Sequence, residues 1–499
     1  MRKLFILLIL FFAGYANAAT YYVEAKASSA LNLVDETSGA CDTEWAAATS
    51  IGSPTSLGTA MYCADDDDVV YFRGGTYNFA FSSYVSDWVG MFSPANSGSI
   101  GSPITFIAYT GETPIWNVTG QDATDQANLF STAGQEYITL DGFTVMGGSG
   151  TRVVTICVSG NTGVEGPYKK GNIVQNMTLD GGAVFAGSNN RDGIWVSDSD
   201  GALIKNNTIY DYAPGNGDDN YAGIKMYHVE NSIFENNYIY NCERGIYSKS
   251  NMNSSIIRYN FITDVSVGIY DASFISQTYS SNNNSVYHNI VLNASFVGIR
   301  WRTEDGVTVA GNVFYNNTLY NTDIGIRAHN GTGWEIYNNV IRRETGSSRY
   351  HIALGETFEL DVSNYNLFDS TQTNPSGFNI TTRYDVGGGN VYTSLASWQS
   401  SGEETGSNNP GANSVYDDPE YVNTSGNMNE IADFALAVTS PGYQTGVGGI
   451  DMGADVSLVG VDAGEPEPEV PANAIQGMQI SNLNVTDNLT AWNRTDNLR

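Results

Sequence analysis

Short apolar runs alternate with polar residues along most of the chain, and the same pattern returns many times. A Gly-Ile pair marks it, in runs such as GIKMY and GIRWR, with the glycine at 193, 223, 245, 268, 298 and 325. The glycines at 223 and 245 are 22 residues apart, and insertions lengthen the other intervals. Between the markers, apolar residues recur with period 2 and not with the 3.6-residue period of a helix. The pattern predicts a repeating unit of three short β-strands.

A second marker is an asparagine followed by apolar residues, in runs such as NNTIY and HNIVL. It occurs as Asn207, Asn237, Asn260, Asn289, Asn317, Asn339 and Asn366. A unit of 22 residues is too short for a strand, a helix and two turns. It suffices for one coil of a solenoid whose equivalent strands stack about 4.8 Å apart. We expect each asparagine to occupy a tight turn in the left-handed conformation and to bond to the asparagine of the next coil. The predicted fold class is all-β, a single-stranded parallel β-helix.

These repeats resemble the right-handed parallel β-helix of the pectate-lyase-like superfamily. The runs DDDDVVYFRGGTYNF and YITLDGFTVMGG fit its early coils, and SPGYQTGVGGIDMGA fits a closing strand. The resemblance implies a right-handed coil over roughly residues 20–460, with the Gly-Ile strand on the active face. It further implies a lysine or arginine as catalytic base, often with Ca²⁺ to neutralise the substrate carboxylate.

Four segments are expected along the chain. Residues 1–18, MRKLFILLILFFAGYANA, combine two basic residues, an apolar run and an A-x-A motif, which is typical of a secretory signal peptide. Residues 19–80 are predicted to form an N-terminal cap and the first strands, 81–460 the β-helix, and 461–499 a linker and a disordered tail. The protein is therefore expected to be secreted or extracellular, in the periplasm or at the cell surface, without a membrane span.

Cysteine usage agrees with export. Cys41 and Cys63 are close enough in sequence to form a disulfide in an exported protein. Cys157 and Cys242 are predicted to be buried thiols. No Cys-x-x-Cys pair supports zinc binding or thiol redox chemistry.

Charge is distributed unevenly. The chain has 22 Lys and Arg against 53 Asp and Glu, a net charge of −31, and only 15% of its residues are charged. Residues 225–351 nevertheless hold ten basic and ten acidic residues, together with all four histidines. The acidic balance and the absence of a basic patch exclude nucleic acid as a partner.

The Gly-Ile strands place these cations on one face, because successive side chains of a strand point in opposite directions. If the isoleucine points into the core, the second and fourth residues after each glycine point to solvent. These positions hold Trp195, Ser197, Lys225, Tyr227, Tyr247, Lys249, Tyr270, Ala272, Arg300, Arg302, Arg327 and His329. Trp301 should then point inward, and Asp271 should be a buried, hydrogen-bonded carboxylate or an exception to the alternation.

Such a face suits an acidic polysaccharide. Aromatic rings stack on sugar rings, and cations pair with uronate or sulfate groups. The predicted substrate-binding residues are Lys225, Tyr227, Tyr247, Tyr270, Arg300, Arg327 and His329. The alternative interpretation is that these are merely β-forming and solubilising residues.

The chemistry predicted for this face is β-elimination. Glycoside hydrolysis normally needs two carboxylates, and the outward positions contain none. Lys249 and Arg302 are the predicted catalytic residues, with Lys249 as the base, because ERGIYSKSNMN resembles the K-S-x-x-N segment of alginate and chondroitin lyases. Nearby cations should lower the pKa of Lys249, and the small Ala272 should leave room for a sugar, with the Cα atoms of Lys249 and Arg302 about 10 Å apart.

The predicted function is therefore a polysaccharide lyase that acts as a monomer on an acidic glycan. The alternative is a non-catalytic, glycan-binding adhesin, surface or fibre protein. For calcium, Asp218 and Asp219 in the loop DYAPGNGDDNYAG are candidate ligands, because Ca²⁺ prefers oxygen donors. The same residues could simply form turns.

Overall fold

The structure is a computed structural model of the chain. It describes residues 19–26, 41–79, 90–119, 127–147, 153–159, 168–182, 192–212, 221–273, 280–303, 309–343, 350–355, 358–371, 378–382, 389–401, 411–423 and 428–461. The chain divides into two units, Met1–Ala463 and Gly464–Arg499. The predicted signal peptide and nearly all of the predicted tail lie outside the described residues, as does all of the second unit.

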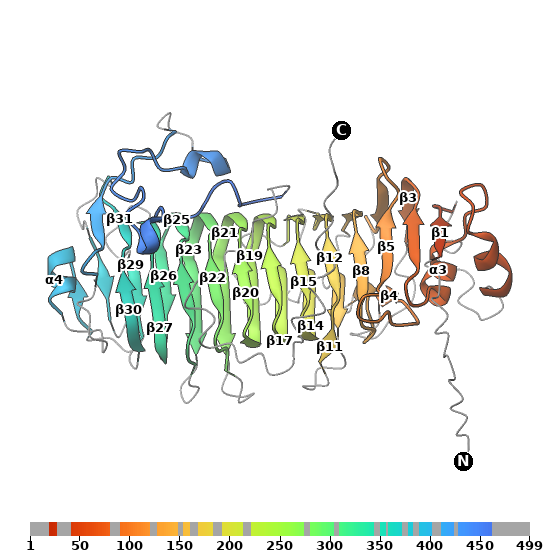
Figure 1. Ribbon diagram of the computed structural model, residues 1–499, viewed down its shortest axis with the longest axis horizontal. Helices are drawn as coiled ribbons and strands as arrows, with labels where there is room; N and C mark the ends of the chain where they lie inside the picture. Colours follow the sequence, from red (N-terminus) through yellow and green to blue (C-terminus); the bar gives the residue numbers. More distant parts are fainter. Residues whose placement is uncertain are drawn as a thin grey trace, which may run out of the picture. The chain divides into compact units, whose positions relative to one another are not determined.

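The described residues form coils of three parallel strands, and Figure 1 shows equivalent strands of successive coils side by side in chain order. One row of strands is a 12-stranded parallel sheet, which we call the first row. Its members are β1 (Thr20–Val23), β2 (Val69–Phe72), β5 (Ile104–Ala108), β8 (Ile138–Asp141), β12 (Ile173–Gln175), β15 (Leu203–Lys205), β18 (Ile233–Glu235), β20 (Ile256–Arg258), β22 (Ser285–Tyr287), β24 (Val313–Tyr315), β27 (Gly331–Tyr337) and β30 (Phe358–Asn364).

Two further rows share one large sheet. The second row follows the asparagine turn and contains β3 (Gly75–Asn78), β6 (Pro114–Asn117), β9 (Thr144–Met146), β13 (Thr178–Asp180), β16 (Thr208–Tyr210), β25 (Thr318–Thr322), β28 (Val340–Arg343), β31 (Leu367–Asp369) and β34 (Val415–Asp417). The third row begins with the Gly-Ile pairs in its central coils and contains β4 (Gly90–Phe92), β7 (Ala127–Ser131), β10 (Val153–Ser159), β14 (Asp192–Asp200), β17 (Ala222–Glu230), β26 (Ile324–Ala328), β29 (Tyr350–Leu354) and β32 (Ile380–Thr381). Three long strands, β19 (Tyr238–Asn253), β21 (Phe261–Ser273) and β23 (Ile290–Thr303), run through both rows. The short β11 (Lys169–Lys170) pairs with β14, and β33 (Val391–Tyr392) pairs antiparallel with β32.

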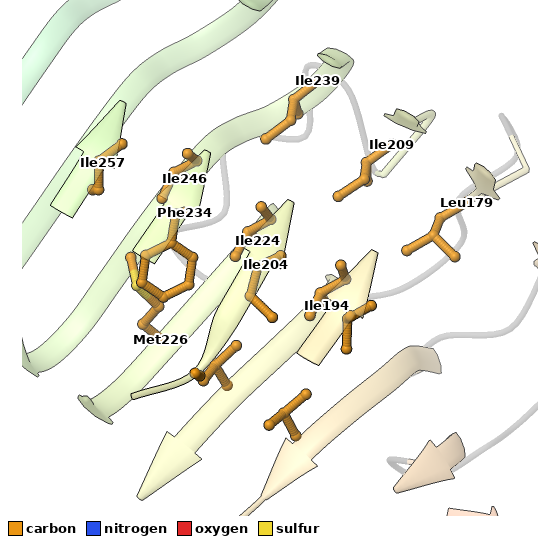
Figure 2. Packing of buried hydrophobic residues seen from close by; sticks show 14 of the residues in the cluster. Leu179, Ile194, Ile204, Ile209, Ile224, Met226, Phe234, Ile239, Ile246 and Ile257 are labelled. Carbon is orange, nitrogen blue, oxygen red and sulfur yellow. The ribbon is translucent and has the colours of Figure 1, made fainter. Parts of the chain in front are cut away.

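All three rows point their alternate side chains into one apolar core. Ile204 from the first row, Ile209 from the second, and Ile224 and Met226 from the third meet there, each with no exposed surface. Figure 2 shows these residues stacked upon their equivalents from neighbouring coils. Fully burying a side chain of this size stabilises the fold by roughly 1.5–3 kcal/mol, so the coils are held together mainly by this column of aliphatic groups.

The recurrent glycine is explained by close packing between coils. A Cβ atom at Gly245 would lie 2.5 Å from the carbonyl oxygen of Gly268, and one at Gly268 would lie 2.6 Å from that of Gly298. No side chain fits at such distances, because the contacting atom is backbone and cannot move aside. The Gly-Ile marker therefore records a point where successive coils approach each other too closely for a side chain.

The asparagine ladder is confirmed. Asn237 Oδ1 accepts hydrogen bonds from the backbone N–H and from Nδ2 of Asn207, at 3.1 and 2.9 Å. The same pair of bonds repeats through Asn260, Asn289, Asn317, Asn339 and Asn366, and Ser414 Oγ ends the series by accepting from the backbone N–H of Asn366. The prediction that the ladder residue itself is left-handed is wrong. The preceding residue has the positive φ, for example 55° at Asn206 and 50° at His288, because the ladder side chain must point inward.

The N-terminal edge of the stack is protected. Residues around helix α3 (Leu57–Cys63) and the helical turn η1 (Cys41–Trp45) lie against β1, where the backbone N–H of Tyr22 donates to Ala48 and its carbonyl accepts from Thr55. The predicted disulfide between Cys41 and Cys63 is confirmed, and so is the burial of the thiols Cys157 and Cys242. Near the other end, helix α4 (Leu395–Gln399) buries Trp398. Such covers prevent an open strand edge from pairing with another chain.

A segment that we call the strap, residues 428–461, returns across the outside of the second row. It contains the short helices η3 (Ile431–Phe434) and η4 (Val447–Gly449). Phe434, Met452 and Val459 of the strap form one buried cluster with outward residues of the second row, Phe261, Ile290, Leu292, Val340 and Leu367. Turn residues hold the backbone of the strap: Asn236 and Asn316 donate to its carbonyl groups, and His288 Nδ1 accepts from the N–H of Asp455.

None of the helices in the part of the chain that the structure describes has the length and apolar character needed to span a membrane.

Candidate functional site

The predicted face exists, because the Gly-Ile strands pair in register. The second residue after each glycine aligns with its equivalent in the next coil, giving one column of side chains outside the third row. This outer column consists of Trp195, Lys225, Tyr247, Tyr270, Arg300 and Arg327. Trp301 points inward as predicted and packs against Phe314 in the core, with ring centroids 5.3 Å apart. Asp271 is the predicted buried carboxylate and accepts a hydrogen bond of 2.7 Å from Ser281 Oγ.

The prediction that this face is open to solvent is wrong for most of its residues. Lys225 and Ala272 have no exposed surface, and Tyr247, Tyr270, Trp195 and Ser197 are almost fully buried. Arg327 and His329 are also buried, at 9% and 7% exposure. Tyr247, Tyr270 and Ala272 form a cluster separate from the core. Alternation therefore placed the side chains on the correct side of the sheet, but it carries no information on what covers that side.

A buried ion pair occupies one end of the outer column. Lys225 Nζ lies 3.4 Å from Asp192 Oδ2, and neither side chain is exposed. Asp192 Oδ1 also accepts a hydrogen bond of 2.9 Å from the backbone N–H of Ala222. Burial holds the pKa of Asp192 above its usual range and that of Lys225 below its own, and the attraction between the two charges opposes both shifts.

Asp192 was missed by the sequence reasoning, although a signal was present. The residue precedes the glycine of its coil, in RDGIWV, and the equivalent residue two coils later is Arg244. Only the second and fourth positions after the glycine had been considered. The position before the glycine also contributes side chains to the outer face, as the packing of Ala222, Val267 and Val297 against Tyr247 and Tyr270 demonstrates.

The tyrosines of the column contact each other and guanidinium groups. The rings of Tyr247 and Tyr270 are stacked, with centroids 4.9 Å apart and planes 8° from parallel. The guanidinium of Arg244 lies 4.4 and 4.6 Å from these two centroids, and that of Arg300 lies 4.7 Å from Tyr270. The prediction that these two rings lie open for stacking on sugars is therefore wrong, because they hold arginines instead.

Three cations of this face stay partly exposed: Lys249, Arg300 and Arg302. Lys249 is the extra residue of a β-bulge, because Met226 pairs with Ser248 whereas Tyr227 pairs with Ser250. A bulge bends the strand locally and re-aims the side chain that it carries. Lys249 Nζ consequently lies 5.9 Å from the ring centroid of Tyr227, which is itself only partly buried.

The arginines form a cluster of like charge. Burial lowers the pKa of Arg300, and the charges of Arg327, Arg302 and Arg244 lower it further, whereas Tyr270 raises it. Within the described residues, Arg300 makes cation–π contacts to Tyr270 and Phe296 and no ion pair with a carboxylate. Like charges held together in partly buried surroundings repel one another.

The predicted calcium ligands Asp218 and Asp219 lie outside the described residues. Within the ranges that the structure describes, no group of three His, Cys, Asp or Glu side chains could hold a metal ion. The calcium site stays a prediction.

Comparisons with known proteins agree with this geometry. Residues 130–314 match the family model described as a right-handed β-helix region. The chain contains a right-handed parallel β-helix. No curated protein sequence matches this β-helix chain significantly.

Solved structures with a similar fold have different activities. A pectate lyase, Pel9A, is 15% identical and aligns over 87% of this chain and 95% of its own, with a TM-score of 0.46. A rhamnogalacturonan lyase is 15% identical over 67% of this chain and 84% of its own, with a TM-score of 0.41. PfbA, a surface adhesin of Streptococcus pneumoniae, is 13% identical over 63% and 80%, with a TM-score of 0.42. At this level of similarity, the activity of the β-helix has to be inferred from its own site.

Proposed function

We propose that the outer face of the third row binds an acidic polysaccharide and cleaves it by β-elimination, with Lys249 as the base. The observation that carries the proposal is the partly exposed cation group, Lys249, Arg300 and Arg302, in which Arg300 makes no ion pair among the described residues. The rest of the chain is strongly acidic, with a net charge of −31 overall. A uronate or sulfate group would supply an anion for Arg300.

Arginine suits this role because its planar guanidinium donates paired hydrogen bonds to a carboxylate or sulfate. The ring of Tyr270 lies 4.7 Å from the guanidinium of Arg300 and helps to position it. Tyr227, His329 and the buried Arg327 and Lys225 belong to the same face. We assign Lys225, Tyr247 and Tyr270 a supporting role, since their burial keeps them from direct contact with a polymer.

The reaction needs a base and a neutralised carboxylate. Lys249 would remove the proton at C5 of the uronate, and the electron pair would form the C4=C5 double bond while the C4–O bond breaks. The departing oxygen would take a proton from water. Arg300 and Arg302 would stabilise the negative charge that develops on the uronate carboxylate.

The described residues of the face do not fit a calcium ion. The carboxylate of Asp192 on this face already forms an ion pair with Lys225 and accepts a hydrogen bond from the backbone N–H of Ala222. No step of the proposed reaction passes through a metal.

A secreted or surface location is part of the proposal. The disulfide between Cys41 and Cys63 supports it, since such bonds persist in oxidising compartments. The burial of most of the outer column favours a second candidate, a non-catalytic adhesin that retains acidic glycans without cleaving them. The covered N-terminal strand edge argues against a fibre built by adding coils end to end.

The test is the ultraviolet absorbance of the new C4=C5 bond when the protein is incubated with pectate, alginate or glycosaminoglycans. Lys249→Ala should lower turnover at least about a hundredfold, the usual contribution of a general base, while leaving retention on the polymer nearly unchanged. Arg342→Ala, an arginine on the second row, is the matched control and should keep full activity. Retention without absorbance in the parent protein would establish the adhesin instead, and equal turnover by Lys249→Ala would exclude Lys249 as the base.

A further inference from the structure

Tyr227 lies beside the proposed base on the outer face. Its backbone pairs with Ser250, the residue after Lys249, so the bulge brings the lysine next to the ring. The centroid of the Tyr227 ring lies 5.9 Å from Lys249 Nζ and 5.8 Å from Lys225 Nζ. Tyr227 and Lys249 are both partly exposed. A polymer that binds this face can therefore meet the base and the phenol together.

The phenol of Tyr227 keeps its proton at neutral pH. Burial raises its pKa above the usual value, and the negative charge of Asp192 raises it further. A protonated phenol can give up a proton but cannot accept one as a base, so Tyr227 and Lys249 suit opposite roles. Once Lys249 has taken a proton from the substrate, its positive charge lies beside Tyr227 and favours the phenolate.

Lys249 and Tyr227 approach a bound polymer from the same side. They belong to β19 and β17, which are neighbouring strands of the third row, and they lie beside each other on its outer face. A polymer that lies along this face presents one side of each sugar ring to it. A base and an acid arranged in this way remove the C5 proton and protonate the C4 oxygen from one side. Such a reaction is a syn elimination.

We infer that Tyr227 is the general acid of the reaction, and that the substrate is a uronate whose C5–H and C4–O bonds lie on the same side of the ring. D-Glucuronate and D-mannuronate units have this configuration. In D-galacturonate, L-guluronate and L-iduronate the two bonds lie on opposite sides. The inference rests on the proposed function, because it assumes elimination with Lys249 as the base. It adds the acid and the stereochemical class of the sugar.

Tyr227 relays a proton from water to the departing oxygen. Lys249 Nζ takes the C5 proton, the electron pair of the C5–H bond forms the C4=C5 double bond, and the C4–O bond breaks with its electron pair on oxygen. The phenol of Tyr227 gives its proton to that oxygen as it departs. The phenolate then takes a proton from water, and the ammonium group of Lys249 returns its proton to water.

Polymers that are C5 epimers of each other test the stereochemical class. Polymannuronate and polyguluronate form one such pair, and unsulfated chondroitin and dermatan form another. In the pair that the full chain cleaves, the ultraviolet absorbance of the C4=C5 bond should appear at least about a hundredfold faster with mannuronate or glucuronate, because the acid reaches the departing oxygen only in these epimers. Pectate, a polymer of galacturonate, should be cleaved as slowly as the disfavoured epimers.

Tyr227→Phe tests the acid, because it removes the hydroxyl and keeps the ring beside both lysines. It should lower kcat on the preferred polymer at least about a hundredfold and leave KM nearly unchanged. A uronate of the same configuration with a nitrophenyl ether at O4 releases nitrophenolate, which needs no proton, so parent and variant should cleave it at similar rates. Tyr315→Phe, at a first-row tyrosine whose pKa is likewise raised by burial, is the control and should change neither rate.

The outcomes separate the inference from the proposed function. Faster elimination from polyguluronate, dermatan or pectate would overturn the inference alone, and so would an unchanged rate of Tyr227→Phe on the polymer. An equal loss of rate on the polymer and on the nitrophenyl ether would also overturn it, since a structural role of the hydroxyl would then explain the loss. Absence of elimination from every acidic polymer would overturn the proposed function itself, and the inference with it.

Discussion

Two rows of this β-helix bury many of the outward side chains of their central coils, and the buried side chains differ in chemistry. The strap covers the second row with apolar side chains, and Phe434 and Met452 share one buried cluster with Phe261 and Leu292. The outer column of the third row buries Lys225 and Asp192 and almost completely buries Arg244. Both rows have the same strand geometry, so the difference lies in the residues that point outward.

The comparison separates side chains that are buried for stability, on the second row, from side chains whose burial needs another explanation, on the third row. Burying apolar side chains stabilises a fold directly, by about 25 cal/mol per Å² of apolar surface. Burying charges does not, because desolvation offsets the attraction between them. A chain that needed only stability would place residues such as Leu292 and Val340 on both rows. Cations on the outer face are therefore more simply explained by a ligand than by folding.

The largest expected effect comes from dividing the buried ion pair. Lys225→Met leaves the carboxylate of Asp192 buried without its cation and should lower the free energy of unfolding by about 3–5 kcal/mol. The double variant Asp192→Asn, Lys225→Met should recover most of this loss, because the introduced amide is neutral and keeps an acceptor for the N–H of Ala222. Urea unfolding of the three proteins provides the measurement. A stable single variant would mean that the pair is not desolvated, and the contrast between the two rows would fail.

Removing an apolar side chain from the strap should lower stability and leave binding unchanged. Phe434→Ala removes a buried ring and should lower the free energy of unfolding by about 3 kcal/mol, at the low end for such changes because a surface segment can partly collapse. Val438→Ala, at a strap residue that is 75% exposed, is the control and should change stability by less than about 0.5 kcal/mol. Retention on acidic polymers should be the same in both variants. Loss of retention in Phe434→Ala would connect the strap to the binding face.

A smaller effect should appear at acidic pH, where His288, which accepts a hydrogen bond from the strap, becomes protonated. Burial lowers the pKa of His288, the charge of Asp455 opposes this shift and that of Arg258 adds to it, and together they bring the pKa to about 4. Its Nδ1 must stay unprotonated to accept from the N–H of Asp455. With a folded pKa below the unfolded value, the stabilisation is complete above the unfolded pKa, near 6.5, and is lost as the pH falls towards 4.

The variant His288→Asn isolates this contribution. Asparagine tolerates the left-handed conformation of this turn, where φ is 50°, and it does not titrate. The difference in unfolding free energy between parent and variant should change by about 1–2 kcal/mol between pH 6.5 and 4. His351 and the carboxylates titrate in both proteins and cancel in this difference. A difference that is independent of pH would show that His288 does not hold the strap through its neutral form.

The repeat and the direction of its side chains could be predicted from the sequence because they depend on local geometry. The interval between Gly223 and Gly245 sets the length of a coil, and period-2 alternation places Ile224 inside and Lys225 outside. The ladder from Asn207 to Asn366 follows from the same repetition. Even Trp301 and Asp271, which look unusual in the sequence, point where the alternation places them.

Several features of the site were decided only by the tertiary structure. The bulge at Lys249 arises from the register between two strands, and no single strand specifies that register. Asp192 meets Lys225 across coils whose separation depends on how the intervening loop folds. The strap reaches Asn236 from Leu458, more than 200 residues later in the chain. Sequence alone thus determined which side of the sheet most residues of the Gly-Ile strands occupy, because that choice is made within a strand. The tertiary structure determined which of these residues are buried, since burial depends on segments that arrive from elsewhere in the chain.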